Sequence, residues 1–246
     1  MDIIDAHVCL GRGEHLSLDV GDLLSLMDEA HISVAIATPV DRYLAVDNRE
    51  GNDFLLSCVR QHPDRIAALA AVNPWYGQRA VSELRRALDE GLMGLILYPN
   101  YQGFRLSDRI VDPLLEVVAE FDLPVYAHSG TAGIAEPLHV TELARRFPSI
   151  NFIMGHGGSS DYGEDAVRAL EFAGNVWLET SRNGPANFGF WKIKGLQFRV
   201  VFGSSAPEYI PAIEIETLCD VFQETEQQKA ILAANIKELY KGRLGS

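Results

Sequence analysis

The stretch Asp2-Ile3-Ile4-Asp5-Ala6-His7-Val8-Cys9-Leu10 opens the chain, and its alternating polar and apolar residues predict a β-strand. Successive side chains of a strand point to opposite faces, so Asp5, His7 and Cys9 are expected on one face and the apolar residues on the other. An acid, an imidazole and a thiol in one row are unusual in an apolar strand. At the end of a barrel strand, such a row would point into an active site.

The rest of the chain repeats a strand-then-helix rhythm. The predicted strands cover about residues 2–9, 32–39, 66–72, 94–98, 123–128, 150–156, 176–180 and 198–203. The predicted helices cover about residues 20–30, 52–61, 80–90, 111–121, 137–147, 165–172, 208–222 and 225–241. The link from 181 to 196, with four Gly and Pro residues, is the least regular part.

Eight short apolar strands alternating with helices predict an α/β fold, a (β/α)₈ TIM barrel that spans residues 1–246 as one domain. Nearly all-apolar strands are typical of a buried parallel sheet. An open, doubly wound sheet is the alternative. Two observations count against it: no Gly-x-Gly-x-x-Gly follows the first strand, and polar residues stand at the ends of several different strands.

Composition excludes several functions. The net charge of −13 argues against nucleic-acid binding and against docking on an anionic membrane surface. No apolar run is long enough to span a bilayer, and the acidic start lacks the basic segment of a signal peptide. Three widely spaced cysteines form no disulfide framework. A reducing, cytoplasmic setting and a small-molecule substrate are therefore expected.

Residues able to do chemistry gather at the carboxyl ends of the predicted strands, which is where TIM-barrel enzymes carry their active sites. They are His7 and Cys9 on the first strand, Tyr98 on the fourth, His128 on the fifth, His156 on the sixth, Arg182 after the seventh, and Ser204-Ser205 after the eighth. Three of the seven histidines in the chain thus stand at strand ends. Imidazole and thiolate are both good zinc ligands, so a metal site is one possibility.

Several of these stretches carry family-like motifs. Ile4-Asp5-Ala6-His7-Val8-Cys9 is similar to an Asp-x-His-x-His strand, and Leu123-Pro124-Val125-Tyr126-Ala127-His128-Ser129-Gly130 to a Leu-Pro-φ-φ-φ-His-x-Gly strand, φ being apolar. Phe202-Gly203-Ser204-Ser205-Ala206-Pro207 is similar to Phe-Gly-Ser-Asp-x-Pro. With these motifs the chain resembles the amidohydrolase-related branch of the metal-dependent hydrolase superfamily, which also contains decarboxylases of aromatic and unsaturated acids.

The resemblance implies a role for each matching position. His7 and His128 would bind a divalent metal, and Cys9 stands where the family has a second histidine. His156 would orient the substrate and help to activate water. Ser205 replaces the aspartate that binds metal and acts as base in the family, which removes a negative charge and a proton acceptor. Zinc is the expected ion, because a thiolate such as Cys9 binds it well.

Two further residues are candidates for substrate contact. Tyr98 stands at the mouth of the fourth strand, and Arg182 could pair with a substrate carboxylate in bidentate fashion. Several aromatic residues in the loops would wall an apolar pocket or pack against a second subunit, which would make the protein a homo-oligomer. They are Trp75, Tyr76, Tyr101, Phe104, Phe188, Phe190 and Trp191.

Three hypotheses about function follow. The first is a metal-dependent hydrolase or decarboxylase that acts on a small carboxylic acid, lactone or amide, with a metal-activated water or a Lewis-acid metal. The second is a metal-free, lactonase-like hydrolase in which His156 is the base. The third is a barrel that has lost catalysis and keeps its pocket as a binding protein, because a fold does not guarantee a function.

Overall fold

The computed structural model describes residues 2–244 and forms a closed parallel barrel. Its strands are β1 (Ile4–Arg12), β3 (Val34–Pro39), β4 (Ile66–Ala68), β5 (Ala70–Ala71), β6 (Leu95–Leu97), β7 (Val125–His128), β8 (Phe152–Gly155), β9 (Val176–Glu179) and β10 (Val200–Val201). A short β2 (Ser17–Leu18) pairs antiparallel with the end of β1. The strands follow one another in two sheets, ordered β2-β1-β3-β4 and β10-β9-β8-β7-β6-β5.

Two seams join these sheets into a barrel. β4 and β5 are one strand interrupted at Leu69, whose N–H donates to the Ala37 carbonyl at 2.9 Å. On the other side, the Cys9 N–H donates to the Ala206 carbonyl at 2.7 Å, which ties β1 to the segment after β10. Counting β4 and β5 together, eight strands close the barrel, so the predicted α/β TIM barrel is confirmed.

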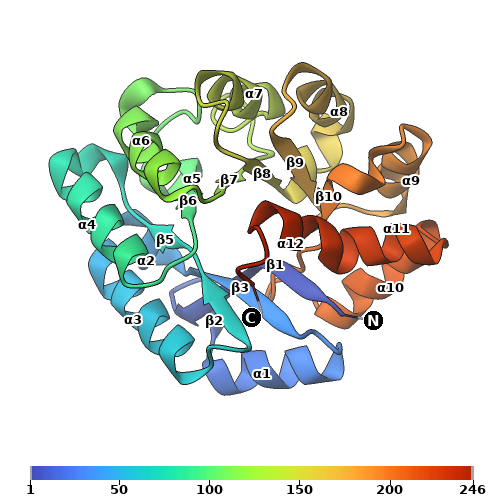
Figure 1. The fold of residues 1–246 in the computed structure, drawn as a ribbon, viewed down its shortest axis with the longest axis horizontal. Helices are drawn as coiled ribbons and strands as arrows, with labels where there is room; N and C mark the ends of the chain where they lie inside the picture. Colours follow the sequence, from blue (N-terminus) through green and yellow to red (C-terminus); the bar gives the residue numbers. More distant parts are fainter. Residues whose placement is uncertain (1, 245–246) are drawn as a thin grey trace.

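Helices surround the strands (Figure 1). The outer helices are α1 (Val20–Glu29), α3 (Asn48–Gln61), α4 (Gln78–Asp89), α6 (Asp112–Phe121), α7 (Pro137–Arg146), α8 (Gly163–Phe172) and α10 (Pro211–Val221). Shorter helices are α2 (Asp41–Ala45), α5 (Pro99–Gln102), α9 (Pro185–Ile193), α11 (Thr225–Lys229) and α12 (Asn235–Leu239), with a π-helical turn at Ala230–Ala234. Single 3₁₀ turns cover Pro74–Tyr76, Arg109–Val111, His156–Gly158, Ser160–Tyr162 and Leu196–Arg199. In the described chain, no helix has the length and apolar character needed to cross a membrane.

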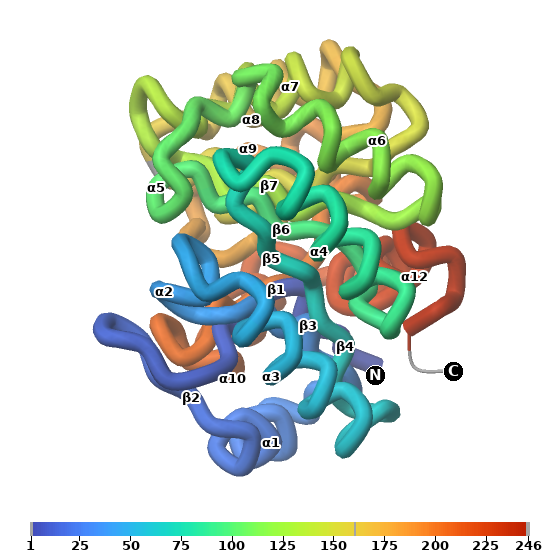
Figure 2. The backbone as a smooth tube through the Cα atoms, turned by 90° about the vertical axis from the view of Figure 1, so that its left-hand side faces the viewer, coloured from blue at the N-terminus to red at the C-terminus, as the bar shows by residue number. Residues whose placement is uncertain are grey.

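The core has two layers. An inner cluster fills the barrel below the site with one or two side chains from each strand, and Ile36, Ile96, Ile153 and Val201 are typical members. An outer cluster lies between the strands and the surrounding helices. The inner cluster also includes Ile236, Leu239 and Tyr240, so α12 covers one end of the barrel. Figure 2 places α12 at that end and the short α2, β2 and α5 at the opposite end.

The predicted strict alternation along β1 is wrong. Pairing with β3 slips between Asp5 and Val8, which is the signature of a β-bulge. Because of the extra residue, Ile4 and Ala6 pack in the inner cluster, whereas Val8 and Leu10 pack in the outer one. At the bulge the Asp5 carboxylate accepts a hydrogen bond from the His7 N–H (3.1 Å). It turns to the segment after β10, where it also accepts from the Ser204 N–H (2.9 Å) and hydroxyl (2.5 Å).

Helix α9 occupies the link that was expected to be irregular. Phe188 and Trp191 on this helix are fully buried, with their rings 5.6 Å apart, and Phe188 also lies 6.4 Å from Phe222. These two aromatic residues are therefore core residues and do not wall a pocket. Trp75, by contrast, is exposed on the rim, with its indole N–H donating to the Gly103 carbonyl.

The side chain of Asn52, on α3, makes the hydrogen bonds to the backbone of β5 that a neighbouring strand would otherwise make, at the point where β3 and β5 diverge. Its amide accepts from the Ala71 N–H at 2.9 Å and donates to the Ala71 carbonyl at 3.1 Å. We expect Asn52→Ala to lower the free energy of unfolding by about 2 to 4 kcal/mol, since each buried backbone group left unpaired costs roughly 1–3 kcal/mol. Urea denaturation at neutral pH measures the change. Gln61→Ala at the exposed end of α3 should shift stability by less than about 0.5 kcal/mol, and equal effects of the two changes would contradict this role.

Candidate active site

Three histidines meet at the carboxyl end of the barrel. His7 comes from β1, His128 ends β7, and His156 follows β8. The His128 and His156 rings are 4.6 Å apart edge to face, and the His7 and His156 rings are 5.8 Å apart. None of the three side chains is more than 2% exposed, so the cluster is closed to solvent. The structure therefore brings together the three histidines that the sequence places at strand ends.

Two tyrosines hold the imidazole rings in place. Tyr126 stacks on His7 at 4.5 Å, and Tyr98 stacks on His128 at 3.8 Å. Tyr126 was missed from the sequence, although it precedes His128 by two residues and thus shares its face of the strand. Its ring fits because Gly155 stands opposite, where any Cβ would clash with it.

Glu179, at the end of β9, is fully buried and accepts four hydrogen bonds. The donors are the Tyr126 hydroxyl (2.8 Å), the His156 N–H (2.9 Å), and both the N–H (2.5 Å) and the hydroxyl (2.8 Å) of Ser181. Burial raises the pKa of Glu179, and these donors partly oppose that rise. Gly203 leaves the space for this carboxylate, because a Cβ there would clash with it.

Ser181 also orients the ring of His156. Its Oγ lies 2.7 Å from Nδ1 of His156. Because the Ser181 hydroxyl donates to Glu179, its oxygen accepts from Nδ1–H, and this tautomer leaves Nε2 of His156 with a free lone pair. The sequence pattern assigns no role to Glu179 or Ser181, because both roles depend on the turn that follows β9.

Burial keeps all three imidazoles neutral at pH 7. It lowers the pKa of His7 to about 3, and it lowers the pKa of His128 and of His156 well below the usual value. The positive charge of Arg182 lowers all three pKa values further. The guanidinium group of Arg182 therefore lies close enough to act on the whole cluster.

Arg182 lies in the turn after β9, next to Ser181, which contacts His156. Its Nη2 forms an ion pair with Glu208, which follows β10, and the two side chains are 35% and 32% exposed. Its Nε is buried without a hydrogen-bond partner among the described residues. The site thus has a cationic group above three neutral imidazoles.

The two positions that differ from the family motifs lie beside His7. The Cys9 sulfur is 3.9 Å from Nε2 of His7 and 3.9 Å from the Thr38 hydroxyl. Burial raises the pKa of Cys9 to about 12, so its thiol keeps its proton at neutral pH. Ser205 is buried with φ of 61°, and its N–H donates to the His7 carbonyl at 2.9 Å.

The donor set does not fit a divalent ion as it stands. Within residues 2–244, no three His, Cys, Asp or Glu side chains are grouped so that they could hold a metal. Ser205 carries no charge where the family motif has a carboxylate, and Arg182 brings a positive charge to the cluster. By contrast, His7 Nδ1 and both ring nitrogens of His128 are buried and have no hydrogen-bond partner among the described residues. The predicted metal ligands His7, Cys9 and His128 therefore remain a proposal, and no chemical step below depends on a metal.

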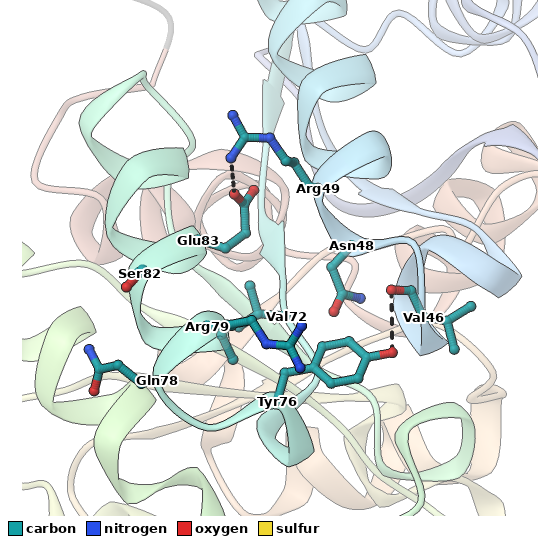
Figure 3. Close-up of a pocket in the computed structure, with 10 residues that line it drawn as sticks. Val46, Asn48, Arg49, Val72, Tyr76, Gln78, Arg79, Ser82 and Glu83 are labelled. Atoms are coloured by element: carbon teal, nitrogen blue, oxygen red, sulfur yellow. Dashed lines mark hydrogen bonds and ion pairs between the residues drawn. The ribbon is translucent and has the colours of Figure 1, made fainter.

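Two of the cavities outside the histidine cluster are lined in part by Val46. One of about 490 Å³ lies between the start of α3 and the first turn of α4, with Asn48, Tyr76 and Arg79 in its lining (Figure 3). The other, of about 460 Å³, is lined by residues that include Arg12, Asp41 and Tyr101. The Tyr101 ring lies 4.9 Å from the Tyr98 ring, so the second cavity adjoins the site.

The fold and the buried histidines define an amidohydrolase-type barrel. The model of the amidohydrolase family matches residues 17–242, and the chain belongs to this family. The matched region begins after β1 and so leaves out His7 and Cys9. Comparison with curated proteins gives no match.

Solved structures with this fold include several enzymes. An uncharacterised TIM-barrel protein from Bordetella bronchiseptica has a TM-score of 0.80 and 16% identity, covering 99% of both chains. A dihydroxybenzoic acid decarboxylase from a Polaromonas species, with bound manganese and 2-nitroresorcinol, has a TM-score of 0.74 and 18% identity, covering 98% of this chain and 96% of that one. A protein named as a 2-pyrone-4,6-dicarboxylic acid hydrolase from Acinetobacter baumannii, with bound citric acid, has a TM-score of 0.72 and 20% identity, covering 98% of this chain and all of that one.

The buried Asp5 provides a test of the site's electrostatics. Burial raises its pKa from 3.8 to about 7, against the hydrogen bonds from Ser204 and His7. A buried carboxyl group with a raised pKa is harder to ionise in the folded protein than in the unfolded chain. The free energy of unfolding therefore falls as pH rises from about 4 to 7. Asp5→Asn should therefore gain stability relative to the wild type over that range and level off above it.

Thermal or urea unfolding at each pH measures this difference. Glu171→Gln, an exposed position on α8, gives the baseline for removing one carboxylate. A stability difference for Asp5→Asn that stays constant between pH 4 and 8 would show that Asp5 titrates normally.

Proposed function

We propose that this protein is an enzyme that acts on a small aromatic carboxylic acid or on the lactone of such an acid. Hydrolysis of the lactone is the reaction that its own side chains support best. The observation that carries this proposal is the hydrogen-bonded chain Glu179–Ser181–His156, which leaves Nε2 of a neutral histidine as a base inside the site.

In the proposed reaction His156 takes a proton from water through Nε2. The water oxygen forms a bond to the lactone carbonyl carbon, and the ring C–O bond then breaks. The proton held by His156 passes to the leaving oxygen, which restores the neutral imidazole. Ser181 and Glu179 support the positive charge that His156 carries between these steps, because the carboxylate lies 3.8 Å from Nδ1.

Arg182 is proposed to bind the substrate carboxylate. A guanidinium group suits this role because it can donate two parallel hydrogen bonds to a carboxylate. The proposal is supported by its charge, which acts on all three histidines, and by its unpaired Nε. Tyr98 would pack against the substrate from the side of His128. Entry requires the Arg182–Glu208 pair to move, since the imidazoles beneath are closed to solvent.

The aromatic character of the substrate is proposed from the relatives of this fold. One is a decarboxylase of a dihydroxybenzoic acid, and another is named as a hydrolase of a pyrone dicarboxylic acid. A metal-dependent decarboxylase is a second candidate function, favoured by the unpartnered nitrogens of His7 and His128 and by the manganese in one relative.

Chelator-treated protein distinguishes the two functions. The probes are 2-pyrone-4,6-dicarboxylate for hydrolysis and 2,6-dihydroxybenzoate for decarboxylation. We expect hydrolysis to survive the chelator, and His156→Gln to lower kcat/KM by about 10²- to 10⁴-fold, the usual contribution of a general base. His62→Gln, at the end of α3, is the matched control and should retain full activity.

Two outcomes would reject metal-free hydrolysis. One is an activity that is lost on chelation and restored by Mn²⁺, which would favour the second candidate. The other is hydrolysis that is unaffected by His156→Gln, because no other described residue has been assigned as the base. Protein that turns over neither probe, with or without metal, would favour a barrel that only binds its ligand.

A further inference from the structure

We propose that Glu208 determines the ligand selectivity of this site. Its carboxylate is bonded to the edge of the Arg182 guanidinium group to which a ligand's carboxylate would bind. In the free protein Glu208 neutralises Arg182. A ligand then binds only if it carries a carboxylate that replaces Glu208. The inference rests on the proposed function, which takes Arg182 as the carboxylate-binding residue.

The position of Arg182 is fixed by the turn in which it lies. Its φ of 59° places it in the left-handed region, at the apex of a turn closed by the Asn183 N–H donating to the Thr180 carbonyl at 3.2 Å. The Asn183 side chain donates to the His156 carbonyl at 2.7 Å. The backbone of Arg182 is thus tied to the ends of β8 and β9, at the same end of the barrel as the histidines.

The hydrogen-bond donors of the Arg182 guanidinium group are only partly paired. Nη2 is paired with Glu208, whereas Nε is buried and has no partner among the described residues. These two nitrogens share one edge of the guanidinium plane, and that edge donates two parallel hydrogen bonds to a bidentate carboxylate. Glu208 takes one of the two positions, so an incoming carboxylate that holds both gains a hydrogen bond that Glu208 does not make.

The side chain of Glu208 can move away from Arg182 without disturbing the fold. The Glu208 N–H donates to the Ser205 carbonyl at 3.0 Å, which fixes the backbone. Within residues 2–244, its side chain is bonded only to Arg182. Because both side chains are about one-third exposed, the pair is worth little in free energy. Glu208 follows Ser205 by three residues, so it stands in the segment after β10 at the mouth of the barrel.

This arrangement selects by charge. A neutral ligand that displaced Glu208 would leave Arg182 beside three buried imidazoles without a counter-ion, which costs free energy. A carboxylate ligand replaces one negative charge by another. The site should therefore bind an aromatic acid and reject the amide of the same shape.

Calorimetric titration with benzoate and with benzamide tests this inference. Glu208→Gln should bind benzoate about two- to fivefold more tightly than the wild type, the range expected from removing one partly exposed competing ion pair. Its affinity for benzamide should not rise. Glu208→Ala is the second variant, and Glu216→Gln on α10 controls for the loss of one negative charge elsewhere.

Arg182→Gln separates this inference from the proposed function. We expect it to lose benzoate binding. If it binds benzoate as the wild type does, the carboxylate-binding role of Arg182 is wrong, and the proposed function fails with it. If it loses binding but Glu208→Gln binds benzoate no more tightly than the wild type, only the role of Glu208 is overturned. An equal gain for benzamide in Glu208→Gln would also overturn it, because the effect would then be steric.

Discussion

The buried carboxylate of Glu179 is the group on which the rest of the site depends. It accepts hydrogen bonds from Tyr126, from Ser181 and from the backbone of His156, so it joins β7, the start of the turn after β8, and β9. A buried carboxylate without such donors would be costly. The same bonds place the Tyr126 ring against His7 and select the His156 tautomer. One residue therefore couples the packing of the barrel to the chemistry at its mouth.

The charge of the cluster follows from two substitutions relative to the family motifs. Ser205 removes a carboxylate, and Cys9 keeps its proton because burial raises its pKa. The positive charge of Arg182 then faces neutral imidazoles, and its counter-ion is Glu208 at the surface. This balance is the basis of the proposal that the site binds an anionic ligand. The substitutions are thus consistent with a change in what the barrel binds.

The sequence was sufficient for the barrel because each strand is a short apolar run followed by a helix with one apolar face. It also placed His7, His128 and His156 at one end, since parallel strands share that edge. Strict alternation failed at β1 because a bulge depends on pairing with β3, which no local pattern reveals. The role of Ser181 and the pairing of Arg182 with Glu208 could not be predicted for a similar reason. Both depend on turns that bring together residues from different parts of the chain.

A crystal structure with a bound aromatic acid tests the account most directly. Crystals grown with Mn²⁺ and soaked in benzoate would report metal and ligand together, through anomalous scattering and electron density. We predict the benzoate carboxylate on Nε and Nη2 of Arg182, with Glu208 displaced and no anomalous peak beside His7 and His128. A manganese peak coordinated by these two histidines, with Arg182 still paired to Glu208, would contradict the account.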